Sequence, residues 1–424
     1  MVRQMMYRLS NPLQSYEWGS KEAIFEAFGW ETTGLPGAEL WLGAHPLAVS
    51  VARTADVLPA HWQDYRHVAV EHTVADGVSL IDLIKSDPHF MLGEAVEEEF
   101  GPRLPYLMKI LAADQPLSLQ VHPKPHIARR GFMRENAAGV ALNDPERNYK
   151  DESHKPEMLV AMTPFEGLSG FRRPQRIIQL LEHVKGDTAS KMREMLQYRP
   201  SAAGIEQAFT LALELRGTNC SVELDESMDS IAELVGLQEQ AGETVSRGHR
   251  TALELFERYP GDPGALVSLM LNRFSLQPGE AVYLGAGQVH AYLSGLGVEI
   301  MASSDNVLRA GLTHKKVDVP ELLQCTDFAP TPAGRPRLRA GTSQLTEYRP
   351  GVPEFALIYG GVEGSAIVPH NGPRIVLCLS GELEVSGVLG PLGTLAAGQS
   401  AFVPHGVGNL GLRGDGSVAI AYVP

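Results

Sequence analysis

The sequence of 424 residues has only three cysteines, Cys220, Cys325 and Cys378, which are widely separated and form no Cys-x-x-Cys pair. A disulfide framework or a cysteine-bound zinc finger needs more cysteines at closer spacing, so neither is supported. Few cysteines suit the reducing cytoplasm. We therefore expect a cytoplasmic protein.

Long apolar runs and an excess of basic charge are also missing. Residues 1–10 carry two arginines but no apolar core, and the charge-free stretch 281–298 is interrupted by glycines and by His290. We expect neither a signal peptide nor a membrane-spanning segment. The formal net charge of −14 argues against nucleic acid as a partner, whereas a small phosphorylated substrate stays possible because one pocket can be locally positive.

What the sequence does contain is typical of a globular protein, with 44% hydrophobic and 20% charged residues. The length is too great for one ordinary core, so two or three packed units are expected. No feature of the composition sets the oligomeric state, and our working expectation is a monomer.

The pattern of apolar residues changes twice along the chain. Short apolar runs punctuated by Pro and Gly predict strands over 104–163, helix-like spacing predicts helices between 174 and 256, and strand signals return after residue 260. A segment rich in Pro and Thr, 330–336, reads as a linker into a last β unit. The prediction is a mainly β protein with an α-helical insertion: a catalytic unit over 1–170 and 261–330, helices over 171–260 and a C-terminal unit over 331–424.

A weak internal repeat supports a shared architecture for the two β units. The segment 278–287 aligns with 397–406, and each copy shows a glycine turn, a strand and a second turn. Such strands suit the jelly roll of cupins, so two cupin-type jelly-roll units are expected. His290 aligns with Asn409, which indicates that any chemistry of His290 belongs to the first unit.

Four residues of the first β unit are candidate metal ligands. Strand periodicity places Gln120 and His122 on one face of 118–122, Glu157 opens an apolar run, and His290 follows a turn of small residues. Each residue taken alone is more simply read as an ordinary polar side chain. Together they offer an amide oxygen, a carboxylate and two imidazoles, a set that suits zinc or another borderline divalent ion.

Charged residues flank these candidates. Asp151 and Glu152 read as part of an ordinary charged turn, whereas Asp305 and Arg309 are expected in a loop rich in small polar residues, with Lys315 shortly beyond it. Arginine offers a planar fork to a phosphate or a developing oxyanion, and lysine offers a point charge. A solvated basic turn explains Arg309 and Lys315 equally well from local sequence.

Several of these segments together resemble the type I mannose-6-phosphate isomerases. The resemblance runs through most of the chain and rests on long ordered motifs: 11–19 (NPLQSYEWG), 38–46 (AELWLGAHP), 119–123 (LQVHP), 148–157 (NYKDESHKPE), 287–292 (GQVHAY) and 304–313 (SDNVLRAGLT). Ser153 departs from the pattern, since the family often has Asn at that place.

The resemblance implies a fold, a reaction and a set of site residues. The implied fold is a cupin catalytic domain with a helical insertion and a C-terminal jelly roll, and the implied reaction interconverts mannose 6-phosphate and fructose 6-phosphate. The zinc ligands of the family fall on Gln120, His122, Glu157 and His290, and its active-site arginine falls on Arg309. Groups for phosphate binding or proton transfer fall on Ser118, His154, Lys155, Asp305 and Lys315.

Two alternatives remain at this point: a cupin that acts on another sugar phosphate, such as glucose 6-phosphate, and a cupin that binds sugar or metal without catalysis. The complete set of candidate ligands disfavours the second. His61, His67 and His72 show no periodic metal spacing, the acidic run 97–99 reads as a solvated helix face, and Cys378 reads as a core residue.

Overall fold

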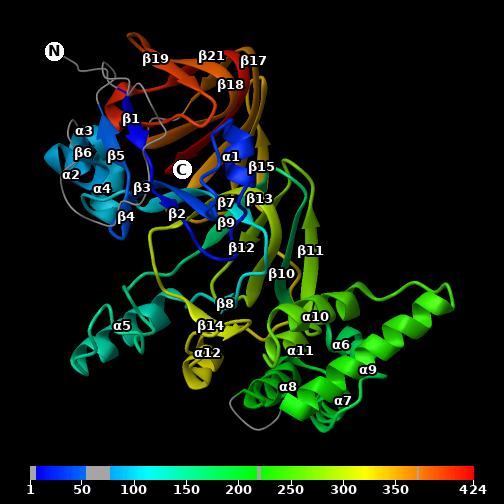
Figure 1. Ribbon diagram of the computed structural model, residues 1–424. Coiled ribbons are helices and arrows are strands. Elements are labelled where there is room, and N and C mark those ends of the chain that lie inside the picture. The colour runs from blue at the N-terminus through cyan, green and yellow to red at the C-terminus, as the bar shows by residue number, and fades with distance from the viewer. Residues whose placement is uncertain (1–5, 54–76, 217–220, 370–371) are drawn as a thin grey trace.

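The computed structural model describes residues 6–53, 77–216, 221–369 and 372–424. Figure 1 shows the C-terminal sheet at the top, a second sheet below it and a group of helices at the bottom. The prediction of a mainly β chain with an α-helical insertion is confirmed by these elements. Cys220, His61, His67 and His72 lie outside the described residues.

Two antiparallel sheets contain the strands of the described residues. We call one the middle sheet, and it consists of β2 (Leu13–Gln14), β3 (Glu39–His45), β4 (Ala48–Val49), β7 (Tyr106–Ala113), β8 (Leu119–Val121), β9 (Glu157–Ala161), β10 (Phe165–Phe171), β11 (Leu271–Leu276), β12 (Ala281–Leu284), β13 (His290–Ala302) and β14 (Leu308–Gly311). The C-terminal sheet consists of β1 (Tyr7–Ser10), β5 (Val51–Arg53), β6 (Val78–Ser79), β15 (Arg337–Ala340), β16 (Gln344–Arg349), β17 (Ala356–Val368), β18 (Arg374–Gly387), β19 (Gly390–Ala396), β20 (Ser400–Val403) and β21 (Leu410–Tyr422).

Amphipathic spacing correctly located the large helices. The helical unit at the bottom of Figure 1 comprises α6 (Pro174–Leu181), α7 (Asp187–Tyr198), α8 (Ala202–Glu214), α9 (Ser221–Gln240), α10 (Arg247–Arg258) and α11 (Gly264–Ser268). The remaining helices are α1 (Ala23–Phe28), α2 (Leu80–Ser86), α3 (Pro88–Leu92), α4 (Glu94–Phe100), α5 (Pro125–Ala137), α12 (Val319–Cys325) and the 3₁₀ turn η2 (His405–Val407). Helix α4 contains the acidic run, which is largely exposed, and Cys378 is buried as expected.

Helix α5 shows that the prediction of strands throughout 104–163 is wrong in part. Pro125 stands in its first turn, where the missing N–H is harmless. Its buried residues are Ile127, Ala128, Gly131 and Glu135, so the apolar period in the sequence is weak. A Cβ at Gly131 would lie 2.3 Å from the ring of Tyr149. Close packing on an aromatic ring replaces the usual stripe of leucines.

The first strand of the chain joins the last sheet. Strand β1 pairs with β20 on one side, with Tyr7 opposite Phe402, and with β5 on the other. Residues near the N-terminus therefore extend the C-terminal sheet, although the sequence gives no sign of a long-range pairing. The internal repeat fits the topology, since β12 and β20 follow its glycine turns and lead into β13 and β21, each 13 residues long.

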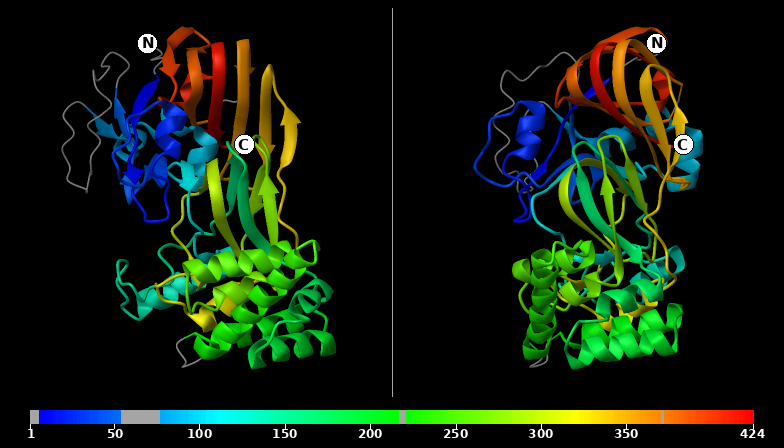
Figure 2. Two further views of the ribbon diagram at one scale, coloured as in Figure 1. Left: turned by 45° about the vertical axis from the view of Figure 1, so that its right-hand side comes forward. Right: turned by 90° about the vertical axis from the view of Figure 1, so that its right-hand side faces the viewer.

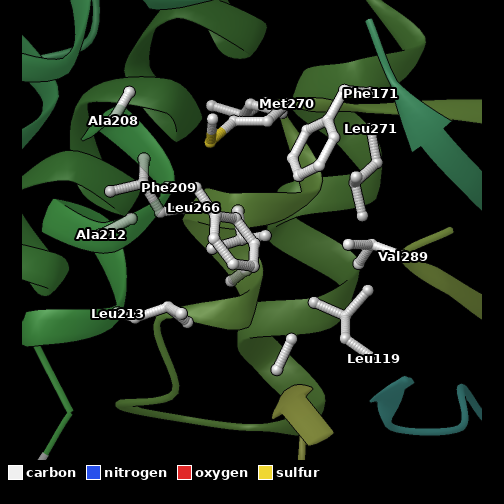
Figure 3. Packing of buried hydrophobic residues seen from close by; sticks show 14 of the residues in the cluster. Leu119, Phe171, Ala208, Phe209, Ala212, Leu213, Leu266, Met270, Leu271 and Val289 are labelled. Atoms are coloured by element: carbon white, nitrogen blue, oxygen red, sulfur yellow. The ribbon is translucent and has the colours of Figure 1, made fainter. Parts of the chain in front are cut away.

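A hydrophobic core between the helical unit and the middle sheet fixes three short strand segments. Leu119, Val121, Val289, Leu308 and Ala310 belong to this core. Figure 3 shows Leu119 and Val289 on the side facing Leu266 and the residues of α8. Because side chains alternate along a strand, Gln120, His290 and Arg309 are directed away from the helical unit.

The two sheets share a second core and direct hydrogen bonds. Tyr106 on β7 donates from its hydroxyl toward the carbonyls of Pro373 and Ala421, each at 3.1 Å. Tyr348 on β16 donates to the carbonyl of Gly279 at 2.6 Å. Figure 2 shows the strands of the C-terminal sheet stacked on those of the middle sheet in both views. The C-terminal sheet is thus anchored on the middle sheet.

Candidate metal centre and active-site cavity

Strand register brings three candidate residues side by side. On β8, Gln120 stands opposite His290 of β13 and, on its other side, opposite Arg309 of β14. The segment 118–122 carries His122 two residues further on the same face. Glu157 is the first residue of β9, which pairs with β13. Four segments of the middle sheet therefore converge on one point.

The Nε2 atoms of His122 and His290 point at the Glu157 carboxylate. His122 donates from Nδ1 to the carbonyl of Asn306 at 2.8 Å, and His290 donates from Nδ1 to the carbonyl of Gln288 at 2.8 Å. Their Nε2 atoms lie 3.3 and 3.5 Å from the two oxygens of Glu157. In a neutral ring of this tautomer, Nε2 carries the lone pair. Burial lowers the pKa of His122 to about 4, although Glu157 opposes the shift, so this imidazole is neutral.

Electron-pair donors that face one another without a hydrogen between them form a cation site. His122, Glu157 and His290 are buried, and their ligand atoms all lie within 4.8 Å of one another. Nε2 of His122 has no hydrogen-bond partner. Gln120 donates from its amide nitrogen to Ser118 at 3.3 Å, which leaves its amide oxygen free. Two imidazoles, one carboxylate and one amide oxygen fit a zinc-like ion.

Lys155 is the cationic neighbour of this centre. Its Nζ lies 2.8 Å from Oε1 of Glu157. Burial opposes ionisation of Glu157, but the Lys155 ammonium favours it, and the pKa of this carboxyl lies well below its usual range. The carboxylate is therefore ionised and able to bind a metal.

A cavity of about 1490 Å³ opens beside the centre. Its lining includes the predicted residues Ser118, Gln120, Lys155, Asp305, Arg309 and Lys315. Burial lowers the pKa of Arg309, and burial together with the nearby Arg309 lowers the pKa of Lys315. Two cations at one end of a cavity form a suitable place for an anionic group.

The loop before Glu157 is organised by Asp151, which is more than the ordinary turn residue expected from sequence. Its carboxylate accepts hydrogen bonds from the hydroxyl of Ser304 at 2.9 Å and from the backbone N–H of Asp305 at 2.9 Å. It also accepts from the N–H of Ser153 at 2.8 Å. Asp151 thereby ties the segment that holds Lys155 to the segment that holds Asp305. Glu152 pairs with Arg129 at the surface.

His154 and Arg309 lie in settings that the sequence did not specify. His154 is absent from the described residues that line the cavity, and its Nε2 lies 2.6 Å from Oε1 of Glu354. Arg309 lies on β14, where a loop was expected.

Several polar residues of the cavity wall were missed at the level of sequence. Lys109 is buried, and its Nζ lies 3.3 Å from a carboxylate oxygen of Glu39 and 3.2 Å from one of Glu299. Burial alone would lower the pKa of Lys109, but the two carboxylates outweigh burial and raise it. Glu39 accepts from the indole N–H of Trp41 at 2.8 Å. A lone lysine in the apolar run 106–111 was the signal that could have revealed this cluster.

His45 is another residue that sequence reasoning missed. Its Nε2 lies 3.4 Å from Oδ1 of Asp305, and both residues line the cavity. Burial lowers the pKa of His45, and Asp305 opposes this effect. Because Nδ1 accepts from the N–H of Leu47 at 3.3 Å, Nε2 carries the proton that faces Asp305. In sequence, His45 stands only as part of a matched motif.

Two jelly-roll-like sheets, a buried His–Glu–His centre and a cation-lined cavity define a metal-binding enzyme of the cupin class. Within the described residues, no helix combines the length and apolar character needed to cross a bilayer. The family model for the catalytic domain of type I phosphomannose isomerase matches residues 6–174.

Relatives match over nearly the whole chain. The mannose-6-phosphate isomerase of Escherichia coli K12 is 37% identical over 422 residues, covering 98% of this chain and 99% of its own. The human mannose-6-phosphate isomerase is 31% identical over 411 residues, covering 91% and 90%. The chain belongs to the type I phosphomannose isomerase family.

Solved structures agree with this assignment. A point mutant of phosphomannose isomerase from Salmonella typhimurium is similar with a TM-score of 0.85 at 34% identity, covering 99% of both chains. A mannose 6-phosphate isomerase described as holo and zinc bound is similar with a TM-score of 0.84, 34% identity and the same coverage.

Proposed function

We propose that this chain is a zinc-dependent isomerase that interconverts mannose 6-phosphate and fructose 6-phosphate. The observation that carries the proposal is the convergence of two unprotonated imidazole nitrogens and one carboxylate beside a cavity lined by Arg309 and Lys315. The first set suits a metal, and the second suits a phosphorylated substrate.

We propose Gln120, His122, Glu157 and His290 as the residues that hold one zinc ion per chain. Bound zinc would supply Lewis acidity toward substrate oxygens. The carbonyls of Asn306 and Gln288 orient the two imidazoles by accepting their Nδ1 protons. These outer hydrogen bonds keep both Nε2 atoms directed at the centre.

Aldose–ketose exchange moves a proton from C2 to C1. A base takes the C2 proton, the C–H electron pair forms the C1–C2 double bond, and the carbonyl oxygen gains negative charge as a cis-enediolate forms. A proton then joins C1, the negatively charged O1 also gains a proton, and loss of the O2 proton makes the new carbonyl at C2. The protein must therefore provide a base, a proton donor and charge stabilisation.

We assign these tasks to residues of the cavity wall. Asp305 is a carboxylate held by the Nε2–H of His45 and fits the role of base. Lys155 fits the role of proton donor to substrate oxygens. Arg309 stabilises the enediolate because its guanidinium lies on the cavity wall and offers several N–H donors in one plane.

Ser118 and Lys315 fit the phosphate. Both line the same cavity as Arg309, and Ser118 precedes Gln120 on the segment that approaches the metal centre. A hydroxyl and an ammonium group together provide a short hydrogen bond and a charge for the phosphate oxygens.

Product analysis tests this function against its alternatives. Purified protein is incubated with fructose 6-phosphate, and the aldose phosphate that forms is separated and identified. Mannose 6-phosphate is the expected product. Glucose 6-phosphate would indicate a different sugar-phosphate isomerase, and no aldose at all would indicate a binding protein.

A further inference from the structure

One side-chain hydrogen bond joins the loop before Glu157 to the C-terminal sheet. Nε2 of His154 lies 2.6 Å from Oε1 of Glu354, although the two residues stand 200 positions apart. Their side chains are 23% and 13% exposed. A carboxylate can only accept, so the Nε2 atom of His154 carries the proton. Partial burial makes this charge-assisted hydrogen bond stronger than one at an open surface.

Glu354 stands on a rigid base. It lies two residues before β17, whose neighbours are β16 and β21, and the next two residues, Phe355 and Ala356, are fully buried. The hydroxyl bonds of Tyr106 and Tyr348 fix the C-terminal sheet against the middle sheet. The carboxylate of Glu354 is therefore a fixed point relative to the cavity that it lines.

His154, the other residue of the pair, lies in a short segment whose two ends are held by hydrogen bonds to backbone carbonyls. The carbonyl of Ser153 accepts from the side-chain amide of Asn306 at 2.8 Å, and that of Pro156 accepts from the N–H of Ala302 at 3.1 Å. Between them stand His154 and Lys155. Successive side chains of an extended segment point in opposite directions. Holding His154 outside the cavity therefore directs Lys155 into it.

We propose that Glu354 is a positioning residue: through it the C-terminal sheet holds His154 and thereby places Lys155 in the active site. The inference rests on the isomerase function proposed above. It assigns the C-terminal sheet a part in the reaction, since the pocket is completed by a carboxylate that arrives 197 residues after Glu157 in the chain.

The test is a double-mutant cycle with the zinc-loaded full chain. The variants are Glu354→Ala, His154→Ala and the double variant, with kcat and KM measured for fructose 6-phosphate. A displaced Lys155 should lower kcat about tenfold or more while KM stays within about twofold, because a small misplacement of a reacting group is costly. The double variant should be no slower than the slower single variant, because both substitutions remove the same contact.

Two further variants sharpen the cycle. Glu354→Gln keeps the shape and an amide oxygen that accepts from His154, and it should restore kcat to within about threefold of the wild type. Glu384→Ala removes an exposed carboxylate of the same sheet and should leave kcat unchanged. This control distinguishes loss of the His154–Glu354 contact from a general loss of negative charge as the cause of a lower kcat.

Three results overturn the proposal. A wild-type kcat in Glu354→Ala, with only the urea unfolding free energy lowered, would make the pair purely structural. Losses in kcat that multiply in the double variant would mean that Glu354 acts on the substrate independently of His154. If the wild type itself forms no mannose 6-phosphate, the isomerase function fails instead, and absence of coupling between the two residues in urea unfolding then also overturns the positioning role.

Discussion

At the scale of single residues, the metal centre is defined by the hydrogen bonds that orient its two imidazoles. His122 and His290 both donate their Nδ1 protons to carbonyls, so in the neutral rings their Nε2 atoms face Glu157 as electron-pair donors. Two imidazole nitrogens and a carboxylate gathered in one buried place favour a bound metal cation in addition to the nearby Lys155. Ordinary packing explains any one of them and fails for all three together.

Arg309 gives the first prediction at this scale. Arg309→Lys keeps a positive charge but loses the planar set of N–H donors, so kcat should fall about 100-fold or more, as it does when an oxyanion donor is removed. Bound zinc, measured by atomic absorption, should stay at the wild-type level. Turnover equal to that of the wild type would contradict the assignment of Arg309 to charge stabilisation.

Lys109 gives a second prediction, on stability. Lys109→Met leaves Glu39 and Glu299 buried without their cation. Burial raises the pKa of Glu299 even with Lys109 present. Breaking a buried ion pair costs about 3–5 kcal/mol, and the free energy of unfolding in urea should fall by that order. A loss below about 1 kcal/mol would show that the cluster is hydrated and not buried as described.

At the scale of elements, alternation along short strands is the feature that makes the site. Leu119 and Val121 enter the helical core, and Gln120 between them turns to the metal centre. The sequence pattern predicted this division of 118–122 correctly. It could not predict that β8 lies between β13 and β14, because the pairing joins residues more than 160 positions apart.

A helix pair supplies a prediction of pH dependence. His249 on α10 donates from Nε2 to the carbonyl of Leu180 on α6 at 2.8 Å, and its Nδ1 is buried without a partner. Burial lowers the pKa of His249, opposed by the bond to Leu180 and assisted by Arg176 and His183. The folded state thus binds this proton less well than the unfolded state.

The sign of the pH effect follows from this lowered pKa. The contribution of His249 to stability is fully present above the unfolded pKa of about 6.5 and is lost as the pH falls through the folded value. In urea unfolding at pH 7.5 and 5.5, the wild type should lose more stability than His249→Gln, whose amide still donates to Leu180. Equal losses in the two proteins would rule out a role for His249.

At the scale of the whole molecule, the two sheets depend on each other. Strand β1 comes from the start of the chain and lies between β20 and β5 in the C-terminal sheet. The order of units along the chain and the two cupin-like units could be anticipated from strand signals and the internal repeat. The boundaries proposed from sequence, 170, 260 and 330, stay predictions, as do the monomeric state and the cytoplasmic location.

This dependence predicts the outcome of a truncation. Removal of residues 338–424 deletes the partner of β1 and exposes the apolar face that Tyr106, Met108 and Ile110 share with the C-terminal sheet. An exposed patch of this kind promotes association. The truncated chain should aggregate or lose its cooperative thermal transition in calorimetry. A soluble fragment with a sharp transition would show that the middle sheet folds alone.

The motifs of the site could be located from sequence, but the connections between them could not. Gln120, His122, Glu157 and His290 could be proposed only as a set, because each alone reads as an ordinary polar side chain. Glu39 and Glu354 have no comparable local signal, and Lys109 is marked only as a lone lysine in an apolar run. Their importance arises from burial and from partners distant in the chain, which only the fold supplies.

Zinc titration tests the central claim most directly. Protein freed of metal by a chelator is given zinc in steps, and isomerase activity and bound zinc are measured on the same samples, with His290→Ala as the ligand variant. We predict that activity is absent without metal, rises in proportion to zinc and saturates at one zinc per chain, and that His290→Ala binds zinc at least about 100-fold more weakly. Full activity in the metal-free protein, or unchanged zinc binding in His290→Ala, would contradict the account.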